Sequence, residues 1–142
     1  MKTRRHILSL VALIMTLVLI QFIPVHRTNP ASETEITAPG PVLVILRKAC
    51  YNCHSNQTRW PWYSNIAPVS WLVARDVTKA REEMNFTTWN RYTPIKQSAK
   101  REDIWKEVKG GHMPPLPYRL MHPEARLTHE EKEQLRAWST TP

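Results

Sequence analysis

Three side chains within five residues could carry chemistry: Cys50, Cys53 and His54, in the order Cys-Tyr-Asn-Cys-His. Two thiols at this spacing can form thioether bonds with the two vinyl groups of one porphyrin, and the histidine that follows is then placed to ligate the iron. No other cysteine occurs in the chain. The pattern therefore predicts covalent attachment of one haem c, with His54 as an axial ligand of its iron.

Four other interpretations of the two cysteines are open: a redox-active dithiol, a structural disulfide, half of a zinc site, and coincidence. A redox dithiol is expected between a strand and a helix, whereas here a loop rich in proline and tryptophan follows. A structural zinc ion needs four ligands, and no second pair of cysteines supplies them. A disulfide leaves His54 without a role. Haem attachment is the interpretation that uses all three residues.

The iron would need a second axial ligand opposite His54, and Met113 is our first candidate. It lies in the sequence Gly-His-Met-Pro-Pro, where two prolines stiffen the loop and hold the thioether at a defined position. A thioether ligand favours ferrous iron and raises the reduction potential. His112 and Met121 are the alternative ligands, and a five-coordinate iron is the third possibility.

Aromatic and basic residues that follow the motif could also contact the haem. The chain contains six tryptophans, and we expect most of them to wall the haem and fill the core. Trp60 or Trp62 could donate its indole N–H to a haem propionate, and Arg59 could pair with a propionate. The alternative for Arg59 is an ordinary solvated side chain.

The N-terminus predicts a membrane anchor. A basic cytoplasmic tip, residues 1–6, precedes an apolar stretch that we assign to a transmembrane signal anchor over residues 7–25. The stretch is longer than the apolar part of a cleavable signal and no small-x-small site follows it, so cleavage is the alternative. Because basic residues stay in the cytoplasm, we expect a single-pass protein of the bacterial inner membrane with its globular part in the periplasm.

The remainder is expected to form a tether that contains prolines, residues 26–41, and one haem-binding domain, residues 42–142. The net charge of +8 is divided between the N-terminal part and the domain. No basic run with interleaved aromatic residues indicates nucleic acid as a partner. The membrane and an acidic redox protein are the partners that the charge pattern allows.

Hydrophobic periodicity predicts an all-α domain, and no stretch alternates as a strand would. Pro68 suits the start of a helix, and Gly110-Gly111 can supply a left-handed C-terminal cap. Thr128 and Glu131 form a capping box. The expected helices run from Val42 to Ala49, from Val69 to Met84, from about Ser98 to Lys109, and onward from Thr128 with Leu135 and Trp138 facing inward.

The residues around these motifs resemble the small bacterial haem-binding domain family of c-type proteins. The resemblance covers roughly Val42 to Trp138 and includes blocks at residues 50–63, 66–72, 84–89, 113–115 and 122–128. It implies one covalent haem on a cytochrome-c-like helical domain behind an N-terminal anchor. It also implies thioether bonds to Cys50 and Cys53 and axial ligation by His54 and Met113.

We therefore expect a membrane-anchored periplasmic monohaem cytochrome that passes single electrons to redox partner proteins in the periplasm or the membrane. A haem-based sensor or ligand-binding module with a labile distal site is the alternative. An enzyme is not expected, because a peroxidase needs distal acid–base groups, for which only His112 and His122 are candidates.

Overall fold

The computed structural model describes residues 2–140, and the regular elements within this range are all helices. This confirms the predicted all-α class. The chain forms two compact units. Unit 1 comprises residues 1–28 and 60–76, and unit 2 comprises residues 29–59 and 77–142.

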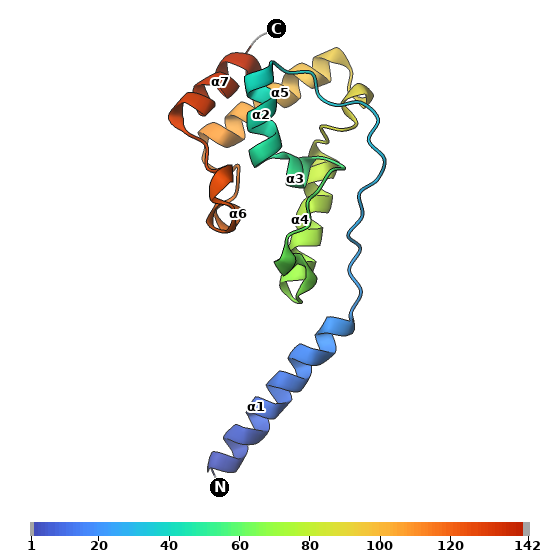
Figure 1. Cartoon of the computed structure of the whole chain (residues 1–142), viewed down its shortest axis with the longest axis vertical. Helices are drawn as coiled ribbons and strands as arrows, with labels where there is room; N and C mark the ends of the chain where they lie inside the picture. Colours follow the sequence, from blue (N-terminus) through green and yellow to red (C-terminus); the bar gives the residue numbers. More distant parts are fainter. Residues whose placement is uncertain (1, 141–142) are drawn as a thin grey trace. The chain divides into compact units, whose positions relative to one another are not determined.

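Unit 1 contains the apolar N-terminal helix. Helix α1 (Lys2–Leu19) continues into a 3₁₀ turn, η1 (Ile20–Phe22), and together they form one helix long and apolar enough to cross a membrane (Figure 1). Its large apolar side chains are exposed on all sides. The same unit includes a second 3₁₀ turn, η2 (Trp62–Asn65), and the first half of α4 (Val69–Glu83).

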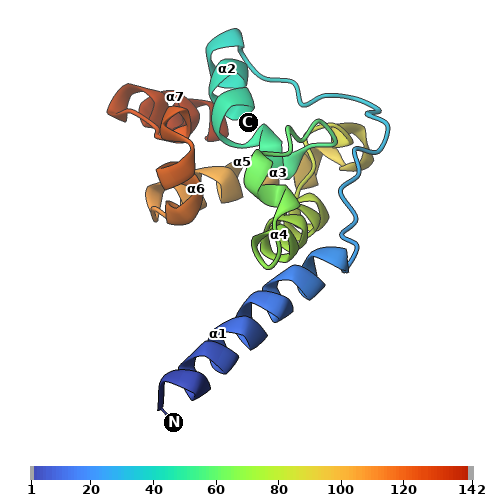
Figure 2. The same ribbon diagram turned by 60° about the horizontal axis from the view of Figure 1, so that its bottom comes forward.

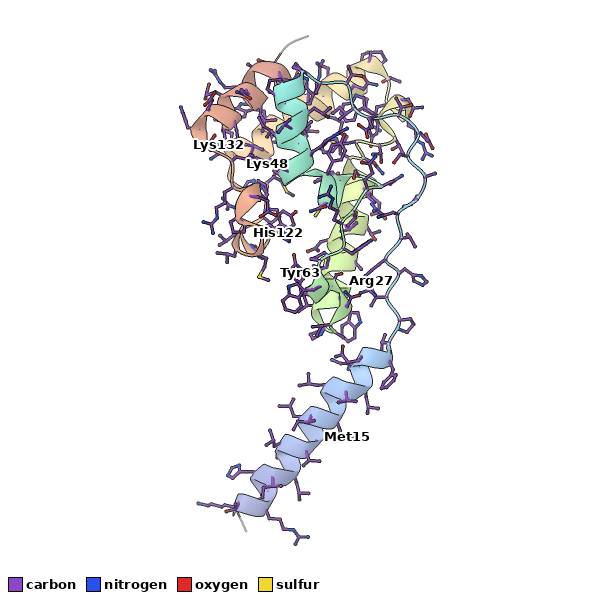
Figure 3. All side chains as sticks on the ribbon, in the orientation of Figure 1. Met15, Arg27, Lys48, Tyr63, His122 and Lys132 are labelled. Atoms are coloured by element: carbon purple, nitrogen blue, oxygen red, sulfur yellow. The ribbon has the colours of Figure 1, made fainter. Side chains whose placement is uncertain are left out.

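Two side chains join the end of this helix to the second segment of unit 1. The amide of Gln21 donates to the peptide oxygen of Ala67 (3.2 Å) and accepts from its N–H (3.0 Å). Arg27 donates to the peptide oxygen of Ser64, and Figure 3 labels Arg27 beside Tyr63 of this segment. The apolar helix is therefore tied at its end to residues 64–67.

Unit 2 is built on three helices: α2 (Gly40–Ala49), α5 (Pro94–Lys109) and α7 (His129–Ser139). Helix α7 packs against both α2 and α5, as the ribbons show from two directions (Figures 1 and 2). The buried core takes apolar residues from all three helices and from the segments between them: Ile36, Val42, Ile45, Leu46, Tyr51, Phe86, Trp89, Ile104, Val108, Leu135 and Trp138.

The second half of the stretch expected to be a tether packs on unit 2. The N–H groups of Glu33 and Ile36 donate to the peptide oxygens of Thr87 and Phe86, both at 2.8 Å. Ile36 is buried in the core. The polar, proline-containing composition of this stretch does not indicate the contact, because the contact uses backbone groups and a single apolar side chain.

Helix α5 begins at Pro94, earlier than the predicted start near Ser98. The Thr93 hydroxyl accepts from the backbone N–H of Lys96 and caps the helix. The first turn has no buried apolar residue, since Ile95 is exposed, so periodicity could not reveal it. The predicted left-handed residue at the other end is confirmed at Gly111, which has a φ of 75°.

Helix α7 begins at the predicted capping box. The Thr128 hydroxyl accepts from the backbone N–H of Glu131, whose carboxylate accepts from the N–H of Thr128 (2.9 Å). Lys48, labelled in Figure 3, donates to the same carboxylate from the last turn of α2. Burial works against the charged carboxylate, but the bonds from Lys48 and Thr128 outweigh it and lower the pKa of Glu131. Glu131 therefore both caps α7 and joins it to α2.

We expect Glu131→Ala to lower the free energy of unfolding at pH 7 by about 1–2 kcal/mol, the usual cost of losing a cap and a half-buried ion pair. A group with a lowered pKa stabilises the fold above its unfolded-state pKa and stops doing so as pH falls through its folded-state pKa. The deficit should therefore shrink when urea unfolding is repeated at pH 3.5. Glu130→Ala, in the same turn, is the control and should change stability by under about 0.5 kcal/mol.

Candidate functional site

Cys50, Cys53 and His54, the predicted haem-attachment motif, lie on one short helical turn. We call residues 50–54 the attachment turn. Cys50 ends α2 with a φ of −125° and begins α3 (Tyr51–His54). Its peptide oxygen accepts from the N–H groups of both Cys53 (3.1 Å) and His54 (2.9 Å). Side chains three and four residues apart lie on the same side of a helical turn. The fold therefore gathers the two thiols and the imidazole at the end of α2, which buries Val42, Ile45, Leu46 and Ala49.

The imidazole of His54 is held by a peptide oxygen from a distant segment. Its Nδ1 lies 3.1 Å from the peptide oxygen of Met84, just beyond α4. A peptide oxygen can only accept, so this bond requires the proton on Nδ1 and leaves the lone pair on Nε2. Histidine ligands of metals are generally oriented by such a bond from the second ring nitrogen. The tautomer of His54 is thus the one that can ligate iron through Nε2.

Phe86 holds the same residue from another direction. Its backbone N–H donates to the peptide oxygen of His54 (2.8 Å), and its fully buried ring lies 5.8 Å from the imidazole. Burial lowers the pKa of His54, although the bond to Met84 acts in the opposite direction. The histidine is therefore neutral near pH 7, which is the form that binds a metal.

Three buried polar residues fix the segment that holds His54. The Asn85 amide donates to the side-chain oxygen of Asn56 (2.7 Å) and accepts from the Thr87 hydroxyl (2.8 Å). The Thr87 hydroxyl in turn accepts from the backbone N–H of Asn56 (2.8 Å). These bonds connect the loop after the attachment turn to the residues beside Met84. Sequence reasoning did not identify this network, although all three of its members lie in blocks that resemble the family.

Arg81 adds a further connection on the same side. Its guanidinium donates to the peptide oxygen of Ser55 (2.7 Å) and to the Thr58 hydroxyl (2.8 Å). Ser55 immediately follows His54. The second half of α4 therefore supports the loop that leaves the attachment turn, and no motif in the sequence marks this role.

The Cys50 thiol lies in apolar surroundings. Cys50 and Cys53 are not joined in a disulfide, and Cys50 packs against the core cluster. Burial raises the pKa of the Cys50 thiol to about 12, and the neighbouring Cys53 adds to the rise. The thiolate is the reactive form of cysteine. In the folded chain Cys50 is therefore protonated and a weak nucleophile at neutral pH.

The attachment turn also binds α6 (Leu116–Met121), a short helix that periodicity did not predict. The Asn52 amide donates to the Tyr118 hydroxyl (2.8 Å). The Tyr118 ring stacks on His122, with 4.3 Å between centroids and 22° between planes. The Nδ1 atom of His122 is 3.0 Å from a carboxylate oxygen of Glu124. Figure 3 labels His122 at the end of α6. Asn52, one of the two residues between the cysteines, thus docks α6 beside the motif.

The candidates for the second axial ligand have different surroundings. Met113 is exposed on the loop between α5 and α6, where its backbone N–H donates to the peptide oxygen of Glu107 (3.2 Å). The Nδ1 atom of His112 lies 3.1 Å from the Glu107 carboxylate at the surface. Met121 is exposed at the end of α6. Ligation by Met113 stays a prediction, and an exposed thioether is available for it.

The residues expected to contact propionates lie in both units. Arg59 belongs to unit 2, is exposed, and donates its backbone N–H to the side-chain oxygen of Asn52 (3.1 Å). Trp60 and Trp62 belong to unit 1. The Trp60 indole N–H is buried without an acceptor in the described structure, whereas Trp62 is exposed. Their expected contacts with propionates stay predictions.

The structure also bears on the alternatives for the two cysteines. Within residues 2–140, no group of three or more His, Cys, Asp or Glu side chains is placed to hold a metal ion. A zinc site around Cys50 and Cys53 would therefore lack partners in this part of the chain. The orientation of His54, by contrast, suits a single axial bond to a porphyrin iron, which needs no cluster of protein ligands.

Comparison with known families gives one match: residues 15–141 match the family described as haem-binding domain. The chain matches none of the curated proteins and none of the solved structures.

We expect the partly buried Cys50 thiol of the haem-free Cys53→Ala variant to react slowly with iodoacetamide. Burial is the larger cause of the raised pKa of Cys50 and persists without Cys53, so the reactive thiolate fraction should rise about ten-fold per pH unit between pH 8 and pH 10. When the same variant is unfolded in urea, the reaction rate of the Cys50 thiol should level off above the ordinary pKa of cysteine, roughly 8.5. Mass spectrometry of quenched samples gives both rates. A folded-state rate that levels off by pH 9 would contradict the raised pKa.

Proposed function

The chain belongs to the haem-binding domain family, and from this premise we propose that it is a membrane-anchored c-type cytochrome that carries single electrons. The proposal rests chiefly on one observation, the bond between His54 Nδ1 and the Met84 peptide oxygen. This bond prepares Nε2 to ligate iron directly beside two cysteines at thioether spacing. A structural disulfide or a redox dithiol would make no use of an oriented histidine.

Haem, when bound, would supply a one-electron couple at its iron, and the residues of this chain would hold and tune it. The Cys50 and Cys53 thiols would attach the porphyrin covalently. The bond to Met84 makes the His54 imidazole a stronger donor to iron. Met113 would complete the coordination and raise the potential. An iron held by the four porphyrin nitrogens and by two protein ligands would have no open position for a substrate, which is why we propose a carrier rather than an enzyme.

The exposure of Met113 favours a second candidate function, a haem-based sensor. Its loop has few buried anchors, although Pro114 is buried. A thioether on such a loop could be displaced by a small ligand such as carbon monoxide. The two functions differ in whether Met113 would keep the second axial position of the iron occupied. A measurement of carbon monoxide binding distinguishes them.

The contacts of the N-terminal helix support an anchor that is retained. Gln21 makes two hydrogen bonds with the peptide group of Ala67 in the same unit, and a cleaved signal would have no use for such contacts. The apolar side chains of α1 are exposed all round, as lipid contact requires. The basic residues Lys2, Arg4 and Arg5 favour a cytoplasmic N-terminus, with the remainder in the periplasm.

We expect covalent haem in the full-length protein when it is produced together with a haem-maturation system. Denaturing electrophoresis with peroxidase staining should show haem on the wild type, and alkaline pyridine should give a spectrum with two thioether bonds. Cys50→Ala combined with Cys53→Ala should abolish the staining, because no thiol is left to bond to the porphyrin. Met113→Ala is the matched control and should keep it. Covalent haem in the double variant would contradict the proposal.

We expect Met113 to be the second axial ligand. The oxidised wild type should show a near-infrared charge-transfer band of methionine-ligated iron. Met113→Ala should lose the band, lower the reduction potential and bind carbon monoxide rapidly, because a strong thioether ligand has been removed. His112→Ala and Met121→Ala should resemble the wild type. Rapid carbon monoxide binding by the wild type itself would support the sensor instead.

A further inference from the structure

Unit 1 has an apolar surface on its second segment, apart from the N-terminal helix. Four large apolar residues are exposed there: Trp62 by 69%, Ile66 by 46%, Val69 by 41% and Leu72 by 51%. They lie within eleven residues that include the turn η2 and the first turn of α4. We call these four residues the apolar surface.

The same stretch carries no charged side chain. Residues 60–74 contain no Asp, Glu, Lys or Arg, although charged residues make up 23% of the chain. Charge returns directly afterwards at Arg75 and Asp76, which are exposed and paired with each other. A water-facing helix normally has a charged outer face. The outer face of this segment is uncharged up to Leu72, with Asn65 as an exposed polar residue, and charge appears within the next turn.

The apolar surface is held close to the end of the apolar helix α1. Gln21, in the last turn of that helix, makes two hydrogen bonds with the peptide group of Ala67. Arg27, five residues past Phe22, donates to Ser64. Ser64 and Ala67 lie between Trp62 and Val69 in the sequence. Whatever surrounds the end of α1 therefore also surrounds this segment.

We propose that the apolar surface lies in the interfacial layer of the lipid bilayer, on the side where α1 leaves the membrane. The inference rests on the proposed membrane anchor and adds a second contact to it. The ligand is the lipid surface itself, at the level of the headgroups and the first carbons of the acyl chains. The anchor is then a two-segment unit and not a single helix.

The chemistry of the segment fits this layer. Tryptophan and tyrosine concentrate at membrane interfaces, because their rings are apolar and their tips are polar. Trp62 is exposed and makes an edge contact with Tyr63, with 5.8 Å between the ring centroids. Aliphatic side chains of a short helix can enter the boundary between headgroups and acyl chains. Arg75 and Asp76 mark where the segment returns to water.

Thiol accessibility in full-length holoprotein tests the inference. Leu72→Cys, Asp76→Cys and Met15→Cys are each placed in lipid nanodiscs, which contain no partner protein, and treated with a charged, membrane-impermeant maleimide. The protein without an added cysteine is treated in the same way, and its labelling measures any reaction at Cys50 and Cys53. Leu72 and Asp76 lie one helical turn apart, and both are exposed in the protein itself. Protein packing alone therefore predicts similar rates for the two.

The expected result is labelling on the order of ten-fold slower at Leu72→Cys than at Asp76→Cys, because a thiol in the lipid layer forms little thiolate. Met15→Cys, inside the span, should not react. Equal rates at Leu72→Cys and Asp76→Cys, with Met15→Cys protected, would overturn this inference and leave the anchor intact. Rapid labelling of Met15→Cys would overturn the anchor, and the inference with it.

Discussion

A histidine that ligates a metal generally donates a hydrogen bond from its other ring nitrogen, and Nδ1 of His54 lies 3.1 Å from the peptide oxygen of Met84. That oxygen lies thirty residues further along the chain. Its position is set by backbone and not by a side-chain rotamer, so it is as rigid as the segment that carries it. The site therefore depends on how firmly residues 84–86 are held against the attachment turn.

Polar groups inside the protein provide this firmness. An apolar core can hold a segment in place, but hydrogen bonds are directional and also fix its orientation. Asn56, Asn85 and Thr87 are buried and bond to one another. Removing one member would leave buried polar atoms unsatisfied, so the network favours a single arrangement. The peptide oxygen of Met84 precedes this network by one residue and takes its direction from it.

The features that were predictable from sequence are local. The capping box at Thr128, the left-handed Gly111 and the all-α class depend on residues within a few positions of one another. The bond from Met84 to His54 and the docking of α6 through Asn52 join distant segments, which no spacing rule reveals. Periodicity also cannot tell which apolar residues of a helix are covered by protein, and Leu72 of α4 is exposed.

The partly buried position of Cys50 bears on the order of steps by which the proposed covalent haem would be attached. A thiol whose pKa is raised to about 12 is almost entirely protonated in the folded chain. Thioether formation is therefore easiest while the chain is unfolded and the thiol is in water. The bonds that orient His54 come from residues 84–86, which take their places only on folding. The thioether bonds would thus form first. Folding would then bring the peptide oxygen of Met84 to Nδ1 of His54 and orient the imidazole toward the iron.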